Sequence, residues 1–262
     1  MTQSSLVVVG VGIKFVSHLS VEAKAYISQS EKVLYLVNDP LMKEWIEQLN
    51  PSSESLDHLY TQHELRVDCY NAITNYILET LVRYKNVCVV MYGHPTVFAQ
   101  PALDAVKQAK KDGYSAKVLP AISAEDCLFA DLLIDPGSCG CQSFEATDFL
   151  IHSRQFDTTS HLILWQVGVI GALSHVKTQN DQNGITILAN YLKQFYLPQY
   201  AVFIYEASQY PSFEPLVDEV TLEELSDKKL SRLTTLYVPP LSKAECNEEM
   251  LKALKINIQN LR

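Results

Sequence analysis

The chain has 262 residues, of which 47% are hydrophobic and 19% charged, a composition typical of a folded globular protein with one or two domains. Its formal net charge is −9, and its basic residues gather only in short pairs such as Lys110-Lys111. Because nucleic acids and anionic membranes bind concentrated positive charge, this composition argues against both classes of partner.

The first 119 residues alternate between short apolar runs and longer helical patterns, which predicts a mostly parallel sheet covered by helices. Strands are predicted at residues 6–9, 32–37, 87–91 and 116–119. Helices are predicted at residues 20–29, 41–49, about 64–84 and 96–111. Ser20 and Asp39 precede two of these helices as expected N-caps, whereas residues 57–62 are expected to be irregular.

The tight turn Tyr92-Gly93-His94-Pro95 directly follows the apolar run at residues 87–91, which reads as a strand buried on both faces. Open α/β sheets bind ligands beyond the carboxyl ends of their strands, so this turn is the expected pocket. A plain strand-to-helix turn is an alternative that the spacing leaves open. Gly10 and Gly12 lack the third glycine of a dinucleotide fingerprint, so they predict a sharp turn or a close approach rather than a phosphate site.

After Pro120, a candidate domain joint, strands and helices alternate less regularly, and antiparallel pairing is expected there. Ser123 with Asp126 three residues later predicts a capped helix over residues 125–133. Further elements are a loop at 135–147, strands at 161–167, 201–205 and 234–238, and helices at 185–197 and 243–256. The predicted organisation is α/β, with a first domain at 1–119, a second with a mixed sheet at 120–242, and a C-terminal helix at 243–262.

Six cysteines are scattered along the chain, and only Cys139 and Cys141 are close in sequence. No second pair and no histidine couple completes a zinc-binding pattern, so no metal site is predicted. The N-terminus has no basic residue before its apolar run, and no later apolar segment is long enough to span a bilayer. We therefore expect a cytoplasmic protein with reduced thiols.

Tyr60, Arg66 and Tyr70 are a candidate catalytic group, because Arg66 and Tyr70 lie four residues apart on one helix face and Tyr60 precedes that helix on an expected loop. A fixed cation favours the phenolate form of a neighbouring tyrosine, and a guanidinium can polarise a carbonyl oxygen. The alternative is structural: Arg66 would pair with Glu64 or Asp68, and the tyrosines would pack on the core.

Three further polar residues lie where chemistry or packing could use them. His94 is a candidate base, although a histidine held in a turn before proline is more often a hydrogen-bonding spacer. Gln166 follows an apolar strand and should bond to backbone or to a ligand. Ser123 is explained most simply as a helix cap, and a helix N-terminus at a strand end is also a ligand site.

Five motifs together resemble the tetrapyrrole-methylase fold family, whose members use S-adenosylmethionine. They are LVVVGVGI at residues 6–13, VMYGHPTVF at 90–98, LPAISAEDCLFADLLIDPG at 119–137, LWQVGVIG at 164–171 and IYEASQYP at 204–211. Within that family the chain is most similar to the borosin enzymes, which methylate backbone α-nitrogens of peptides. The combination of YGHP, SAEDCLFADL and WQ is specific to this resemblance, and its motifs cover most of the chain.

The resemblance implies roles for residues by their position in these motifs. Tyr70, helped by Tyr60 and Arg66, would remove or share the amide proton, and Arg66 and Tyr92 would bind the substrate carbonyl and the methyl-donor side. Which tyrosine acts as the base stays open. The residues implied to line the S-adenosylmethionine pocket are Tyr92, His94, Val97, Phe98, Ser123, Ala124, Gln166, Tyr205, Ala207 and Pro239.

Fused borosin enzymes carry their own apolar substrate peptide at the C-terminus, and the present sequence ends at Arg262 without one. The resemblance therefore implies a split enzyme that acts in trans on a separate precursor peptide, releases S-adenosylhomocysteine and needs no metal. It also implies a homodimer, or a heterotetramer with two precursor chains, with the long helix and the 135–147 loop as partner contacts. The alternatives are a methyltransferase for a tetrapyrrole or another small molecule, and an inactive relative that binds a peptide.

Overall fold

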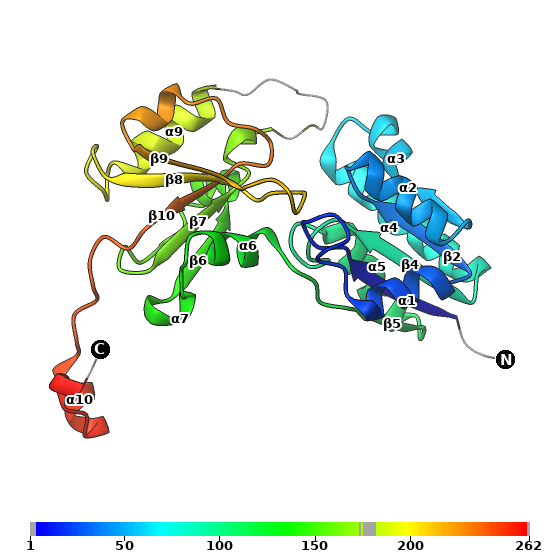
Figure 1. Cartoon of the computed structure of the whole chain (residues 1–262), viewed down its shortest axis with the longest axis horizontal. Coiled ribbons are helices and arrows are strands. Elements are labelled where there is room, and N and C mark those ends of the chain that lie inside the picture. The colour runs from blue at the N-terminus through cyan, green and yellow to red at the C-terminus, as the bar shows by residue number, and fades with distance from the viewer. Residues whose placement is uncertain (1–3, 173, 175–181, 261–262) are drawn as a thin grey trace. The chain divides into compact units, whose positions relative to one another are not determined.

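The computed structural model describes residues 4–172, 174 and 182–260, which form two compact units (Figure 1). The first unit comprises Met1–Ile134, Gly171–Asn180 and Tyr205–Val217, and the second comprises Asp135–Ile170, Asp181–Ile204 and Asp218–Arg262. Each unit is made of three separate stretches of the chain, so the units do not correspond one to one with the predicted domains bounded at residues 119 and 242. The predicted domain boundaries stay a prediction.

The first unit is built on a five-stranded sheet in the order β3-β2-β4-β1-β5, in which every recorded strand pair is parallel. Its strands are β1 (Ser5–Gly10), β2 (Lys32–Leu36), β3 (Ser53–Ser55), β4 (Asn86–Met91) and β5 (Ser115–Val118). Its helices are α1 (Val21–Gln29), α2 (Pro40–Leu49), α3 (Asp57–Gln62), α4 (Arg66–Arg83), α5 (Gln100–Lys111) and α6 (Ala124–Asp131). The parallel sheet predicted for this part of the chain is confirmed.

Both faces of this sheet are covered, because alternate residues of each strand face opposite sides. Leu6 and Val8 of β1 join a core that contains residues from α3, α4 and α5. Val7 and Val9 join a second core that contains residues from α1 and α2. A strand with two buried faces must be apolar throughout, which explains the unbroken apolar runs in the sequence.

The sheet order creates a switch point between β1 and β4. The chain leaves β1 through α1 toward β2, but it leaves β4 through α5 toward β5, so the two loops diverge to opposite sides. They touch at their starts: the N–H of Gly93 donates to the carbonyl of Gly12 at 3.0 Å, and the N–H of Gly12 donates to Gly93 at 3.3 Å. A Cβ on Gly10 would lie 2.2 Å from the carbonyl oxygen of Gly93. The predicted close approach therefore occurs between two loops of the chain.

The long helix α4 buries most of the face that its apolar spacing predicts, since Cys69, Ile73, Ile77 and Leu81 have no exposed surface. Leu65, expected on the same face, is instead the N-cap and is 48% exposed, because the helix begins one residue later. Its opposite face is open to solvent and includes Val82. Neither this helix nor any other in the described ranges is long and apolar enough to cross a membrane.

The second unit holds a five-stranded sheet in the order β6-β7-β10-β8-β9. Its strands are β6 (Cys141–Glu145), β7 (His161–Trp165), β8 (Ala201–Glu206), β9 (Leu216–Thr221) and β10 (Thr235–Val238). Its helices are α7 (Pro136–Cys139), α8 (Ala146–Ile151), α9 (Gln182–Leu192) and α10 (Glu248–Leu254), with 3₁₀ turns at Val167–Val169, Glu224–Asp227 and Ile258–Asn260. β6 pairs with β7 in parallel and β7 with β10 antiparallel, so the predicted mixed sheet is confirmed.

Two expectations of irregular structure are wrong. Residues 57–62 form α3, where the single buried Leu59 is too little for a helical period to be visible in the sequence. Residues 135–147 hold α7, β6 and the start of α8, because hydrogen bonds from β7 stabilise a polar strand at the sheet edge that has no apolar alternation of its own. The closing helix α10 is also shorter than the predicted span of 243–256.

An aromatic cluster in the second unit contains a buried hydroxyl with no hydrogen-bond partner among the described residues, that of Tyr196. Its ring lies 5.0 Å from the ring of Tyr200, whose hydroxyl donates to the carbonyl of Pro240 at 3.0 Å. Burying a polar group without a hydrogen-bond partner destabilises the folded state, whereas a buried hydroxyl that makes its hydrogen bond stabilises it.

Tyr196→Phe should therefore raise the free energy of unfolding by about 1 kcal/mol, while the matched change Tyr200→Phe should lower it by about 1 kcal/mol. Urea denaturation of both variants and the parent chain, followed by fluorescence, measures the difference. Equal destabilisation by the two changes would show that the Tyr196 hydroxyl is satisfied in solution.

Candidate functional site

The carboxyl edge of the parallel sheet is crossed by residues 205–217, called here the 205–217 segment, which belongs to the first unit. The carbonyl of Gln209 accepts from the N–H of Phe15 in the loop after β1, at 2.8 Å. The Gln209 side chain lies near the hydroxyl of Tyr92 in the turn after β4 and acts to lower the pKa of that phenol. The segment therefore contacts both loops that diverge at the switch point, where open α/β sheets bind ligands.

Two tyrosines tie the same segment to further elements of the first unit. The hydroxyl of Tyr205 donates to Oδ2 of Asp131, the last residue of α6, at 2.7 Å. The hydroxyl of Tyr210 donates to Oδ2 of Asp39, the N-cap of α2, and the ring of Tyr210 lies 6.3 Å from that of Phe15. Four elements of the first unit thus hold the segment.

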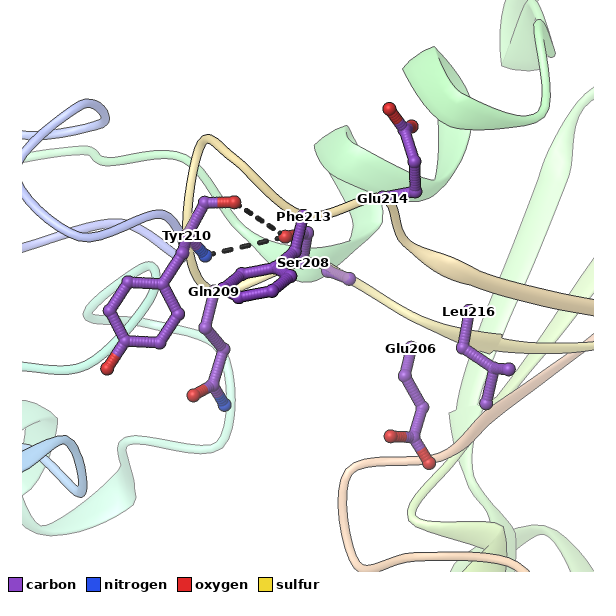
Figure 2. Close-up of a pocket in the computed structure, with 8 residues that line it drawn as sticks. Glu206, Ser208, Gln209, Tyr210, Phe213, Glu214 and Leu216 are labelled. Atoms are coloured by element: carbon purple, nitrogen blue, oxygen red, sulfur yellow. Dashed lines mark hydrogen bonds between the residues drawn. The ribbon is translucent and has the colours of Figure 1, made fainter.

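The 205–217 segment itself forms an open pocket of about 280 Å³ (Figure 2). The pocket is lined by Glu206, Ala207, Ser208, Gln209, Tyr210, Phe213, Glu214 and Leu216. Ser208 braces the turn, because its Oγ donates to the carbonyl of Tyr210 at 2.8 Å and accepts from the N–H of Tyr210 at 3.4 Å. Ala207, predicted as a cofactor contact, therefore lies in the wall of a pocket.

The turn after β4 keeps its predicted geometry at Gly93, whose φ is +70°. The Nδ1 of His94 accepts from the N–H of Thr96 at 3.2 Å, which agrees with a histidine that acts as a hydrogen-bonding spacer. Burial raises the pKa of Tyr92 to about 12, although the Gln209 side chain acts in the opposite direction. Tyr92 therefore stays a neutral phenol at physiological pH.

The end of that turn places an aromatic ring next to the expected pocket. Phe98 has a φ of +52°, an uncommon value for a residue with a side chain, and is 49% exposed. Val97 just before it is half-buried, and its N–H donates to the carbonyl of His94 at 3.0 Å. An exposed aromatic ring on a constrained backbone is a surface on which a planar ligand group can pack.

The start of α6 is a complete capping box, as the sequence predicts. The Oγ of Ser123 accepts from the N–H of Asp126, and the Asp126 carboxylate accepts from the Ser123 N–H at 2.7 Å. Ser123 is 6% exposed, and Ala124 is the first residue of the helix. The cap is confirmed, and the contact of these two residues with a cofactor stays a prediction.

Gln166 and Pro239 belong to the second unit, whereas the other eight predicted cofactor residues belong to the first. Gln166 follows β7 and adopts a left-handed backbone with φ of +58°, which is strained for a residue with a side chain. Pro239 follows β10, and its carbonyl accepts from the Tyr200 hydroxyl at 3.2 Å. The contribution of both residues to a cofactor site stays a prediction.

The candidate catalytic group Tyr60, Arg66 and Tyr70 comes together in the first unit. Tyr60 lies on α3 rather than on the expected loop, and Arg66 and Tyr70 occupy the first turns of α4. All three side chains are half-buried. The Nε of Arg66 is buried with no hydrogen-bond partner among the described residues, and Arg66 makes no ion pair with Glu64 or Asp68. The ion pair of the structural alternative is therefore wrong for the described residues, whereas its other half holds for Tyr60, which packs against the core.

Burial outweighs the guanidinium in this group, so both phenols are harder to ionise than an ordinary tyrosine. Burial raises the pKa of Tyr70, and the charge of Arg66 opposes it as the second largest influence. Burial raises the pKa of Tyr60 more strongly, supported by Tyr70, Cys69 and Asp57, and Arg66 is its weakest influence. The simple expectation of a lowered phenol pKa is wrong for the free protein, and Arg66 acts mainly on Tyr70.

Replacing Arg66 by Met should therefore raise the pKa of Tyr70 further, because the positive charge that favours its phenolate is removed. The pKa of Tyr60 should move less. NMR titration of the chain with ¹³C-labelled tyrosine rings measures both values, and Tyr76→Phe assigns a neighbouring resonance as a control. An unchanged Tyr70 titration would show that the two groups do not interact.

Sequence reasoning missed Phe15, Asp131, Gln209 and Tyr210, and it treated Asp39 only as a helix cap. Tyr210 and Gln209 are inside the motif at residues 204–211, so the signal was present but pointed to no contact. The hydrogen bond from Tyr210 to Asp39 joins residues 171 positions apart, and no spacing in the sequence reveals such a pair.

The family model for tetrapyrrole (corrin/porphyrin) methylases matches residues 5–225. The chain is 37% identical, over 96% of its length, to the methyltransferase/ribosomally synthesized cyclic peptide dendrothelin A precursor of Dendrothele bispora. It is 38% identical, over 93% of its length, to a methyltransferase/type III borosin cyclic peptide precursor of Anomoporia bombycina. The chain spans only 61% and 29% of these two relatives.

Solved structures show the same fold at low sequence identity. Uroporphyrin-III C-methyltransferase of Thermus thermophilus matches with a TM-score of 0.65 at 16% identity, covering 92% of this chain and 93% of that one. A structure of that enzyme complexed with S-adenosyl homocysteine matches with a TM-score of 0.60 at 17% identity, covering 90% and 92%. The predicted two-domain α/β fold, with one parallel and one mixed sheet, is confirmed.

Proposed function

Because the chain belongs to the tetrapyrrole (corrin/porphyrin) methylase family, we propose that it transfers methyl groups from S-adenosylmethionine to backbone amide nitrogens of a precursor peptide. The observation that carries this proposal is the buried Nε of Arg66, which has no hydrogen-bond partner in the described part of the chain, in a side chain that lies beside Tyr60 and Tyr70. The relatives support it, since their names join a methyltransferase to a ribosomally synthesized peptide precursor. Nothing in a methylation of carbon or oxygen on a small ring compound requires this trio.

Each of these relatives is described as a methyltransferase and a peptide precursor in one protein. For the present chain we propose that the peptide is a separate molecule. We further propose a homodimer, or a heterotetramer with two precursor chains, that works in the cytoplasm. The exposed face of α4 and residues 135–147 are the proposed contacts with a second copy.

The residues at the carboxyl edge of the first unit fit a methyl donor that is partly aromatic and partly charged. Gly10 leaves no room for a side chain between the loops, so backbone groups border the edge directly. Phe98 offers an exposed ring, and Ala207 lines the pocket of the 205–217 segment, which begins at the fully buried Tyr205. Tyr92, His94, Val97, Ser123 and Ala124 would complete the contacts in this unit. When bound, the donor supplies an electrophilic methyl group on a sulfonium.

The residue types of the trio suit the difficult half of the reaction. An amide nitrogen is a poor nucleophile because its lone pair is delocalised into the carbonyl. It becomes reactive as its proton leaves and negative charge develops on the carbonyl oxygen. The guanidinium of the half-buried Arg66 can donate to that oxygen and stabilise the charge where water is excluded. Transfer also requires that the nitrogen be aligned with the methyl group of the donor. We propose that Tyr92 contributes to this alignment.

Tyr70 is the better candidate for the proton acceptor. A general base must reach its deprotonated form, and the charge of Arg66 favours the phenolate of Tyr70 more than that of Tyr60. Tyr60, whose pKa is raised more by burial, would remain a neutral donor that helps to hold the substrate oxygen. This assignment gives the two tyrosines different roles on the basis of their surroundings.

The first test incubates the purified chain with S-adenosylmethionine and a separate apolar peptide of the precursor type. Mass spectrometry should show gains of one CH₂ unit, which fragmentation localises to backbone nitrogens. Turnover of a tetrapyrrole without any gain on peptide would favour the small-molecule methyltransferase. Binding of peptide with neither product would favour an inactive relative.

The second test compares variants of the trio. Tyr70→Phe and Arg66→Ala should reduce methyl transfer by at least 10²-fold, the usual contribution of a general base or an oxyanion donor, and calorimetry should show S-adenosylhomocysteine binding close to that of the parent chain. Tyr76→Phe is the matched control and should keep activity, because Tyr76 lies further along α4 and its hydroxyl bonds to Glu54 of β3.

Since the pKa of Tyr70 is raised, the rate of the parent chain should rise with pH without a plateau below about pH 9. Loss of donor binding in the trio variants would refute the assigned roles.

A further inference from the structure

Asp39 serves two elements at once. Its Oδ1 accepts from the N–H of Met42 at 2.8 Å and caps α2, and its Oδ2 accepts from the hydroxyl of Tyr210. The cap explains why an aspartate stands before Pro40, but a serine or an asparagine would cap the helix as well. The second oxygen is needed only for Tyr210. The choice of a carboxylate at this position therefore points to the 205–217 segment.

Tyr210 connects the pocket wall to a residue outside the 205–217 segment, because its hydroxyl donates to Asp39. Ser208 connects it to the wall, because the Ser208 Oγ bonds to both the N–H and the carbonyl of Tyr210. In Figure 2 the side chain of Tyr210 lies on the far side of the turn from Glu206 and Leu216. A shift of Tyr210 would thus move the turn that follows Ala207.

The remainder of the loop between β8 and β9 is held less firmly. Phe213 is 67% exposed, although its ring lies 6.1 Å from that of Tyr210. Leu216 is 49% exposed. A charge-assisted hydrogen bond is roughly twice as strong as one between neutral groups, so the Asp39 carboxylate is a strong restraint on a segment with much exposed surface.

We propose that Asp39 and Tyr210 are positioning residues that hold the 205–217 segment as one wall of the methyl-donor site. They act through Ala207 and the turn braced by Ser208, and not by contact with reacting atoms. This inference rests on the proposed function, because it takes the carboxyl edge of the first unit as the donor site. It assigns a task to a carboxylate that the sequence explains only as a helix cap.

Two substitutions separate the hydrogen bond between Asp39 and Tyr210 from the role of Asp39 as the N-cap of α2. Asp39→Ser keeps a good N-cap but is too short to reach Tyr210, and Tyr210→Phe removes the donor while leaving the ring that packs near Phe15. Each should weaken S-adenosylhomocysteine binding by about tenfold, measured by calorimetry on the whole chain. The double variant should bind no more weakly than either single variant, because both remove the same bond.

The kinetic expectation is equally specific. The KM for S-adenosylmethionine should rise by about the same factor, the KM for peptide should stay unchanged, and kcat should fall less than in Tyr70→Phe. The urea midpoints of the variants show whether they fold. Tyr26→Phe, a half-buried tyrosine of α1 that packs on the other residues of its own core and not on the 205–217 segment, is the matched control and should bind the product like the parent chain.

The outcomes distinguish this inference from the proposed function. A parent chain that binds S-adenosylhomocysteine but methylates no peptide refutes the proposed substrate and leaves the restraint measurable by binding. Folded variants that bind as tightly as the parent chain, or single effects that add in the double variant, overturn the role of Asp39 and Tyr210. A parent chain that binds no S-adenosylhomocysteine overturns both.

Discussion

The contact of two glycine-bearing loops at the switch point of the parallel sheet is the constraint on which the rest of the site depends. Gly10 has no space for a Cβ against Gly93, and the backbones of Gly12 and Gly93 bond to each other. This contact fixes where the turn with Tyr92 begins and where Phe15 lies. The 205–217 segment can then contact both loops, because their positions at the carboxyl edge are set by backbone contacts rather than by mobile side chains.

The trio on α3 and α4 shows how burial can prepare a polar group for a substrate. Burial raises the pKa values of both tyrosines in spite of the nearby charge, so the free protein does not hold a ready phenolate. The same burial leaves the Nε of Arg66 without water or a protein partner among the described residues. The Arg66 side chain as a whole is half-buried, so its guanidinium can still donate to an incoming carbonyl oxygen, and that bond is strong where water is excluded. Charge stabilisation on the substrate, more than a lowered phenol pKa, is the physical basis for the proposed chemistry.

The sequence predicts those parts of the fold that depend on local chemistry. The buried strands β1 and β4 follow from unbroken apolar runs, and the caps at Ser20, Asp39 and Ser123 follow from side chains that bond to the next turn. Structure that depends on distant partners is not visible in the same way. The polar edge strand β6 needs β7, and β9, which is mostly exposed, was not predicted at all. The trio was found by resemblance and spacing, whereas the bond between Tyr210 and Asp39 required coordinates.

Backbone strain coincides with two of the residues that the resemblance implies as cofactor contacts. Six described residues other than glycine have a positive φ, and two of them, Phe98 and Gln166, are among the ten predicted cofactor contacts. Each such conformation costs about 1–3 kcal/mol and persists only where its surroundings require it. Gln166 is followed by Val167, whose N–H donates to the carbonyl of Thr234 and so fixes the chain after the strained residue. Gln166 directly follows the buried strand β7 of the second unit, and Phe98 ends the turn between β4 and α5 in the first. A strained, side-chain-bearing residue is a costly way to make a connection, and within each unit it is what a preorganised binding surface requires.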